Sequence, residues 1–148
     1  MRRIFADSSI LIAGAGSRSG ASRAVLTMAE IGLFKLLVSR QVLDECDRNL
    51  RKKLPAALPL FVELLALVNL EIVPDPPLAE SVRWQSIIEA KDAPILAAAV
   101  LAAPDRLLTL NTKDFTPAVA ARSSLIIQTP GDFVQEIRAI IETGLSEP

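Results

Sequence analysis

The sequence predicts an α/β fold in which helices cover both faces of a central, mostly parallel sheet. Short β-prone runs alternate with helical patterns along the 148 residues, and this alternation is typical of parallel strands joined by crossover helices. No internal repeat or linker divides the chain, and 51% of its residues are hydrophobic. We therefore expect one domain, residues 1–148, that buries its core without disulfides or a structural metal.

Apolar runs and turn residues place the predicted strands. The first run enters Asp7 and is followed by the apolar residues 10–12 and by a Gly/Ser-rich stretch, residues 14–20, which we expect to be a loop. Residues 74–77, with three prolines, indicate a turn after the third strand. The five predicted strands span residues 3–6, 33–38, 70–73, 106–109 and 125–127.

Helical spacing, caps and prolines place the predicted helices. Ser39 is the expected N-cap of the helix that follows it, and Thr129 with Asp132 resembles a capping box. Pro94 falls in the first turn of an Ala-rich helix, after a break at residues 91–92. The predicted helices span residues 21–30, 40–54, 60–68 and 78–90, one that begins near Pro94, and one that runs from Thr129 through Ile141.

The net charge of the chain argues against non-specific binding to nucleic acid. It is −1 at pH 7, with a pI of about 5.5, so the basic excess that drives binding to phosphate backbones is missing. Bound divalent cations would weaken this objection, because they reduce the negative field that a phosphate meets. The mean hydropathy of +0.38 indicates either a protein-binding face or simply a core rich in Ala and Leu.

The absence of histidine limits the chemistry that the chain can perform. It excludes histidine-ligated zinc, Ser-His-Asp and Cys-His nucleophile systems, and imidazole acid–base catalysis. If the protein is an enzyme, carboxylates and metal-bound water are therefore the expected tools.

The cysteine content and the lack of a long apolar segment favour the cytoplasm. Cys46 is the single cysteine, cannot form an internal disulfide, and lies in a helical pattern that indicates packing. Asp7 comes too early for the apolar region of a secretory signal. The longest conspicuous apolar run, residues 93–104, is shorter than the roughly 20 residues that span a bilayer, so no membrane association is expected.

The Gly/Ser-rich stretch does not match a dinucleotide-binding loop. Its third glycine, Gly20, comes one position late for G-x-G-x-x-G, and the second strand ends in Ser39-Arg40, where an NAD-binding fold needs an acid. Two interpretations stay open for this stretch: a flexible loop, or a phosphate-contacting loop that uses Arg18 and Arg23.

Four acids in separate segments are candidate site residues, although each has an ordinary structural explanation. Asp7 and Asp92 are placed to cap helices, Glu45 lies at the border of a charged helix face, and Asp114 is a loop acid. Active residues of parallel α/β folds gather at the carboxyl ends of the strands, so we expect the four acids to meet on one rim of the sheet. Crowded carboxylates repel each other unless a cation neutralises them, which favours a metal site.

The order and contexts of these acids resemble those of PIN-domain nucleases. The branch that the chain resembles most is the toxin component of toxin–antitoxin pairs, whose members also carry the segment at residues 20–23 and a late Thr129-Pro130. The resemblance implies a three-layer α/β/α PIN-like fold. The segments that carry it extend over nearly the whole chain and comprise residues 5–12, 39–45, 91–99 and 108–115.

The resemblance also implies roles for individual residues. The acids that would be catalytic and hold Mg²⁺ or Mn²⁺ are Asp7, Glu45, Asp92 and Asp114. Hydrogen bonds that orient these acids are expected from Ser9 and Thr109, while Asn111, which stands where many PIN domains have aspartate, can position a water or a ligand. The expected RNA-binding residues are Arg18, Arg23 and Lys113.

The implied function is hydrolysis of single-stranded RNA by a toxin. A divalent ion can polarise the phosphoryl group and lower the pKa of a water, which replaces the missing histidine. The expected partners are RNA, a cognate antitoxin and a second copy of the chain. The antitoxin or the second copy is expected to bind through apolar helices at residues 21–31 and 54–68. Two alternatives stay open: a non-catalytic PIN-like module that binds RNA or a protein with a weakened metal site, and a small-molecule α/β enzyme.

Overall fold

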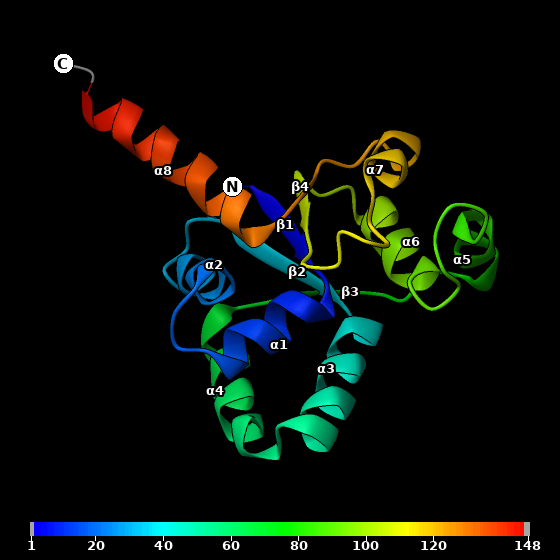
Figure 1. The fold of residues 1–148 in the computed structure, drawn as a ribbon, viewed down its shortest axis with the longest axis horizontal. Helices are drawn as coiled ribbons and strands as arrows, with labels where there is room; N and C mark the ends of the chain where they lie inside the picture. The colour runs from blue at the N-terminus through cyan, green and yellow to red at the C-terminus, as the bar shows by residue number, and fades with distance from the viewer. Residues whose placement is uncertain (1, 147–148) are drawn as a thin grey trace.

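Five parallel strands form one sheet in the computed structural model (Figure 1). The strands are β1 (Arg3–Ala6), β2 (Lys35–Ser39), β3 (Glu71–Val73), β4 (Arg106–Leu108) and β5 (Ile127–Gln128). Their order across the sheet is β3-β2-β1-β4-β5. The structure describes residues 2–146; Met1, Glu147 and Pro148, which belong to the predicted domain, lie outside the described residues.

Helices cover both faces of the sheet, so the predicted three-layer α/β class is confirmed (Figure 1). They are α1 (Ser8–Gly16), α2 (Ala21–Glu30), α3 (Arg40–Lys53), α4 (Leu58–Val68), α5 (Leu78–Trp84), α6 (Ala93–Ala102), α7 (Pro117–Ser123) and α8 (Pro130–Ser146), with a 3₁₀ turn, η1 (Pro55–Ala57). Helices α1 to α4 pack together on one face, and α5 to α7 lie on the other. Helix α8 packs against α2 and then runs away from the rest of the molecule. None of the helices within residues 2–146 is long and apolar enough to cross a membrane.

The direction in which the chain adds strands reverses at β1. From β1 the chain proceeds to β2 and β3 on one side, and then crosses to β4 and β5 on the other side. Ala6 pairs with Leu108 at the ends of β1 and β4, so the next residues, Asp7 and Thr109, emerge side by side. Open α/β sheets bind ligands at such a reversal, outside the carboxyl ends of the strands.

The strands are apolar on both sides because helices cover both faces of the sheet. Burial of each such side chain contributes about 1.5–3 kcal/mol relative to exposure, so the sheet is a firm base for the loops at its edge. Helix α6 adds an apolar surface that is buried from Ala93 to Ala99 except at Pro94. The largest fully buried strand residues are Ile4, Phe5, Leu36, Leu37, Leu107 and Leu108.

Helix α1 was not predicted from the sequence. Residues 14–16 were expected in a loop, but the helix continues through Gly16. Gly14 is buried where α1 meets α2, and a Cβ atom at this position would lie only 2.4 Å from Cδ1 of Leu26. The glycine therefore permits close packing of two helices and does not mark a turn.

Several element boundaries in the rest of the chain also differ from the prediction. Helix α5 ends at Trp84 and not at residue 90, because turns replace it in residues 85–92. Helix α7 was not predicted; Thr116 caps it by accepting the Val119 amide at 3.3 Å. The second and fifth strands end at Ser39 and Gln128, one residue later than expected.

The two predicted helix caps are present. The Ser39 hydroxyl accepts the Val42 amide at 3.2 Å at the start of α3, and the Thr129 hydroxyl accepts the Asp132 amide at 3.2 Å at the start of α8. Each cap satisfies an amide that has no partner within its helix.

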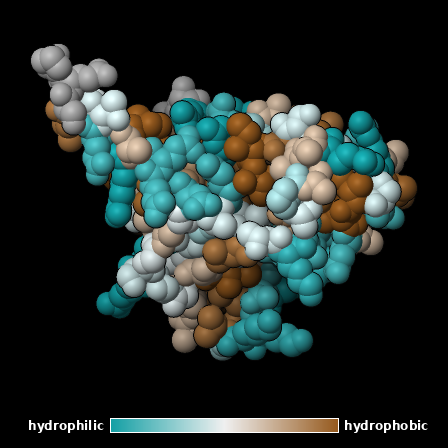
Figure 2. Space-filling view, turned by 45° about the horizontal axis from the view of Figure 1, so that its top comes forward, coloured by the Kyte–Doolittle hydropathy of each residue, from teal (hydrophilic) through white to brown (hydrophobic). Residues whose placement is uncertain are grey.

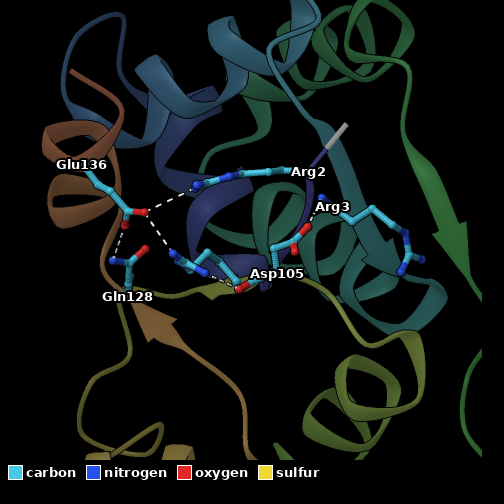
Figure 3. Close-up of polar contacts among 6 residues, drawn as sticks. Arg2, Arg3, Asp105, Gln128 and Glu136 are labelled. Atoms are coloured by element: carbon cyan, nitrogen blue, oxygen red, sulfur yellow. Dashed lines mark hydrogen bonds and ion pairs between the residues drawn. The ribbon is translucent and has the colours of Figure 1, made fainter. Parts of the chain in front are cut away.

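A polar cluster at the amino-terminal edge of the sheet connects α8 to the strands (Figure 3). The Glu136 carboxylate accepts hydrogen bonds from Arg2 at 3.3 Å, from Arg106 at 2.9 Å and from Gln128 at 2.8 Å. The bond from Gln128, followed by that from Arg106, holds the pKa of Glu136 below its usual range. The cluster therefore joins the start of α8 to β4 and β5.

Candidate active site

Asp7 follows β1 directly and is buried at the carboxyl end of the sheet. Its backbone amide donates to the Leu108 carbonyl at 3.2 Å, and its carboxylate caps α1 by accepting the Ser9 amide at 3.1 Å. The hydroxyls of Ser9 and Thr109 donate to its two oxygens, each at 2.5 Å. Burial raises the pKa of Asp7, while these hydrogen bonds oppose that shift. Asp7 is therefore a helix cap and also a carboxylate with a fixed orientation.

The same two hydroxyl groups hold the loop after β4. Ser9 Oγ accepts the Leu110 amide at 3.0 Å, and Thr109 Oγ1 accepts the Asn111 amide at 2.9 Å. Each hydroxyl therefore donates to Asp7 and accepts from the loop. This double use fixes the Asp7 carboxylate relative to the segment that carries Asp114.

Glu45 lies in the second turn of α3 and faces the start of α1. Its Oε2 accepts the Ser8 hydroxyl at 3.0 Å, and its Oε1 accepts the Gln41 side-chain amide at 3.3 Å. The Gln41 amide also donates to the Lys91 carbonyl at 3.4 Å, which connects α3 to the turn before α6. Helix α3 thus brings Glu45 close enough to Asp92 for its charge to affect the pKa of that residue.

Asp92 precedes α6 but does not cap it. Its side chain makes no hydrogen bond to the helix amides, and its backbone is already helical. The residue is only 8% exposed, and its Oδ2 has no hydrogen-bond partner among the described residues. Burial, followed by the contact with Asp114, raises the pKa of Asp92 to about 6. The structural explanation that the sequence allowed for Asp92 therefore fails.

Asn111 holds Asp114 in its position next to Asp92. The Asn111 amide nitrogen donates to Asp114 Oδ2 at 3.0 Å, and its amide oxygen accepts the Asp114 backbone amide at 3.3 Å. The first of these bonds is the main reason that the pKa of Asp114 lies below its usual range. Asp114 is therefore the ionised member of the pair, and Asp92 is the member that takes up a proton.

A cleft of about 560 Å³ lies between the start of α1, helix α3 and the turn before α6. Acidic and amide side chains line one end of it, and cations of α3 line the other. The cations follow Glu45 along the helix at spacings of three, seven and eight residues, which places them on the same side. The lining side chains are Ser8, Ile12, Glu45, Arg48, Asn49, Lys52, Lys53, Lys91, Asp92 and Asn111.

None of the three predicted RNA-binding residues lines this cleft. Arg23 is half-buried and donates through Nε to the Gly14 carbonyl at 2.7 Å, so it connects α2 to α1. Arg18 and Lys113 are exposed in loops. The cleft cations Arg48 and Lys52 were not predicted, although their helical spacing from Glu45 could have identified them.

The sequence argument also missed an acid beside Asp92 and Asp114. One carboxylate oxygen each of Glu89, Asp92 and Asp114 lies within 4.8 Å of the other two. The atoms that could bind a metal are all carboxylate oxygens, the type of ligand that Mg²⁺ and Mn²⁺ prefer. Because one Asp92 oxygen is also buried with no hydrogen-bond partner in the described part of the chain, these residues fit a divalent cation.

Cys46 lies beneath the site and serves the packing of α3 against α1. Its thiol donates to the Ser8 carbonyl at 3.7 Å, and the residue is fully buried. Burial, followed by the charge of Glu45, raises the pKa of the Cys46 thiol. Only the thiolate is a good nucleophile, so Cys46 is not a candidate for covalent chemistry.

Comparisons with known proteins identify relatives of this fold. The family model described as PIN domain matches residues 3–113, a segment that includes Asp7, Glu45 and Asp92. The structure of PAE2754 from Pyrobaculum aerophilum is similar, with 19% identity and a TM-score of 0.65 over 93% of this chain and 90% of that chain. VapBC2 from Rickettsia felis, bound to a DNA fragment from their promoter, is similar with 18% identity and a TM-score of 0.64 over 86% of this chain and 98% of that chain. No curated protein gives a significant sequence match.

Proposed function

This chain belongs to the PIN domain family, and on this basis we propose that it is a metal-dependent ribonuclease that acts as the toxin of a toxin–antitoxin pair. The observation that carries the proposal is the buried Asp92 carboxyl, which has an oxygen with no hydrogen-bond partner among residues 2–146 and faces Asp114 at the edge of the sheet where Asp7 emerges. We take residues 1–148 as one PIN domain. We also propose a cytoplasmic location, which the free and buried Cys46 supports.

Mg²⁺ or Mn²⁺ is the proposed cofactor, and the residues that would hold it are Asp7, Glu45, Asp92 and Asp114. A bound divalent cation supplies polarisation of the scissile phosphoryl group and a lowered pKa for a water. The hydroxyls of Ser9 and Thr109 support this site by keeping Asp7 in one orientation. The hydrogen bonds of Asn111 keep Asp114 ionised and close to Asp92.

The proposed RNA path follows α3. Arg48, Lys52 and Lys53 line the cleft and form no ion pair with any described residue, whereas Arg51 on the same helix pairs with Asp47 at 2.9 Å. Unpaired cations beside a group of acids give an approaching phosphate a local attraction that the net charge of −1 does not provide. These side chains replace Arg23 as the proposed contacts, while exposed Arg18 and Lys113 stay possible contacts outside the cleft.

The proposed protein partners are a cognate antitoxin and a second copy of the chain. Helices α2 and α4 and their neighbouring turns leave large apolar side chains exposed, and Figure 2 shows hydrophobic side chains gathered in patches on one face of the molecule. Contiguous apolar patches on a protein surface commonly mark binding sites for other proteins. A strictly monomeric mass at high micromolar concentration would contradict the homodimer. The exposed side chains in this region are Ile31, Leu33, Leu54, Val62 and Leu67.

One observation favours the alternative of a non-catalytic PIN-like module that binds RNA or a protein. Both polar ends of the Asn111 side chain are engaged with Asp114, so the position that is aspartate in many PIN domains offers no free ligand. Under this alternative the protein binds RNA without cutting it. Cleavage of RNA in the presence of Mn²⁺ separates the two functions directly.

The test measures cleavage of single-stranded RNA with Mn²⁺ and with a chelator. We expect cleavage only with the metal, and its loss in Glu45→Gln. Asp44→Asn is the matched control, because Asp44 is an exposed acid on the same helix. RNA binding without cleavage by the wild-type protein, under conditions in which Mn²⁺ is bound, would overturn the enzymatic proposal in favour of the binding module.

A further inference from the structure

We propose that Glu89 is a further metal ligand, which together with Asp92 and Asp114 binds a divalent cation on the outer side of the candidate site. The inference rests on the proposed function, because Asp92 and Asp114 belong to both groups of residues. Glu89 is not among the four acids of the proposed catalytic site, and it lies outside the side chains that line the cleft.

A tight turn fixes Glu89 beside Asp92. The Glu89 carbonyl accepts the amides of Asp92 at 2.9 Å and of Ala93 at 3.0 Å, so the backbone makes one turn between the two acids. Residues three apart in such a turn point to the same side. Asp114 comes from the other direction, on the loop after β4, and Asn111 holds it there. Two segments of the fold therefore bring three carboxylates together at one point.

The spacing of the three carboxylates suits one ion. Their nearest oxygens all lie within 4.8 Å of one another. Oxygens bound to one Mg²⁺ at about 2.1 Å are separated by about 3 Å when adjacent and about 4.2 Å when opposite, so only small side-chain movements are needed. Glu89 is 60% exposed at its side chain, and this freedom allows the adjustment.

The buried Asp92 carboxyl shows why a ligand is needed here. Asp92 is more than nine-tenths buried, and its Oδ2 has no hydrogen-bond partner among residues 2–146. A buried polar oxygen without a partner costs free energy, and the neighbouring acids cannot provide a hydrogen to it while they are ionised. A cation between the three groups removes both the missing contact and the repulsion.

An ordinary ion pair does not explain the position of Glu89. Its only cationic neighbour among the described ion pairs is Lys91, with Nζ 3.7 Å from Glu89 Oε2 and with 71% of its side chain exposed. Exposed pairs of this kind contribute roughly 0–1 kcal/mol, so the pair is easily exchanged for a metal ion. Asp7 does not belong to this cluster of three acids.

The test is a calorimetric titration of the metal-free protein with Mn²⁺, followed by the same titration of Glu89→Gln. We expect Glu89→Gln to weaken Mn²⁺ binding by about tenfold or more, or to remove one bound ion, in line with the loss of a supporting or direct ligand. The control is Glu63→Gln, which makes the same chemical change at an exposed acid on α4. It should titrate as the wild type does. Equal melting temperatures of the metal-free variants show that both are folded.

The outcomes separate the ligand role of Glu89 from the proposed nuclease activity. If Glu89→Gln titrates with Mn²⁺ as the wild type does, Glu89 is not a metal ligand. The proposed nuclease activity then still stands, provided that RNA cleavage depends on Mn²⁺ and on Glu45. If Glu89→Gln binds Mn²⁺ more weakly but the wild-type protein does not cleave RNA, the metal site is supported and the proposed nuclease activity is overturned. Absence of any Mn²⁺ uptake by the wild-type protein overturns both.

Discussion

Thr109 donates a hydrogen bond of 2.5 Å to Asp7, although 102 residues separate the two in the chain. The bond joins the ends of β1 and β4 at the point where the order of strands reverses. It is buried, and the same hydroxyl accepts the Asn111 amide. This contact is therefore the most direct connection between the amino-terminal acid and the loop that carries Asp114.

Thr109→Val should reduce both the affinity for metal and the stability of the fold. The substitution keeps the shape of the side chain but removes the donor to Asp7, and loss of such an orienting partner costs about 10–100-fold in affinity. The unfilled hydrogen bonds should lower the free energy of unfolding by about 1–3 kcal/mol. Calorimetry with Mn²⁺ measures the first effect. Thr112→Val, in the exposed part of the same loop, is the control, and unchanged affinity in Thr109→Val would contradict the orienting role.

Asp92→Asn should abolish RNA cleavage while the metal-free protein stays as stable as the wild type or becomes more stable. Removal of the carboxylate relieves the repulsion from Asp114 and Glu45, and no helix cap is lost because Asp92 makes no cap bond. The measurement compares activity with the melting temperature in the absence and presence of Mn²⁺. A large drop in the melting temperature of the metal-free variant would identify Asp92 as a structural residue instead.

In the metal-free protein, the contribution of Asp92 to stability should fall as the pH rises through the range from about 4 to 6. The folded pKa of Asp92 is about 6 and lies above the value of 3.8 that is usual for aspartate, so within this range Asp92 binds more protons in the folded state than in the unfolded state. Stability therefore falls with rising pH, by up to about 3 kcal/mol for a shift of this size. Denaturant unfolding at several pH values, with a chelator, measures the slope, and Asp92→Asn should flatten it.

Mn²⁺ binding should strengthen as the pH rises over the same range, because the ion must displace the proton that Asp92 carries. Calorimetry in buffers of different ionisation enthalpy measures the protons released per ion. No proton release at pH 5.5 would show that Asp92 does not contact the ion. Asp44→Asn should leave the release unchanged, since Asp44 is exposed on the outer side of α3.

Glu136→Gln should weaken the attachment of α8 at neutral pH. The pKa of Glu136 is lowered by Gln128 and Arg106, so its contribution to stability is present above the unfolded pKa and is lost as the pH falls through the lower folded pKa. We expect a loss of about 1 kcal/mol at pH 7 and a smaller difference from the wild type near pH 3. Denaturant unfolding at the two pH values tests this, with Glu63→Gln as the control.

Gly14→Ala should destabilise the protein although alanine favours helices. The new Cβ would lie 2.4 Å from Cδ1 of buried Leu26, and overpacking of this kind costs about 1–3 kcal/mol, against a gain of about 1 kcal/mol in helix propensity. Gly144→Ala in α8 has open space around it and should be neutral or stabilising. Thermal unfolding of the two variants measures the contrast, and equal stability of both would show that Leu26 moves aside freely.

Local features of the fold were determined by the sequence itself. Strand composition placed the central strands, and the hydroxyls of Ser39 and Thr129 cap the helices that the sequence assigned to them. The contexts of Asp7, Glu45 and Asp92 led to the PIN family, which the family match confirms. These features depend on chemistry within a few residues of each position, so the order of residues is sufficient to predict them.

Only the tertiary structure decided which side chains meet. Arg23 looked like a phosphate contact but is used to join α2 to α1, whereas the cations of α3 lie along the cleft. Glu89 looked like an ordinary helix residue until the turn after α5 placed it beside Asp92 and Asp114. The cap that the sequence allowed for Asp92 is absent, because its carboxyl faces Asp114 across the edge of the sheet. Distances between residues far apart in the chain depend on how all helices pack on the sheet, and no local pattern contains that information.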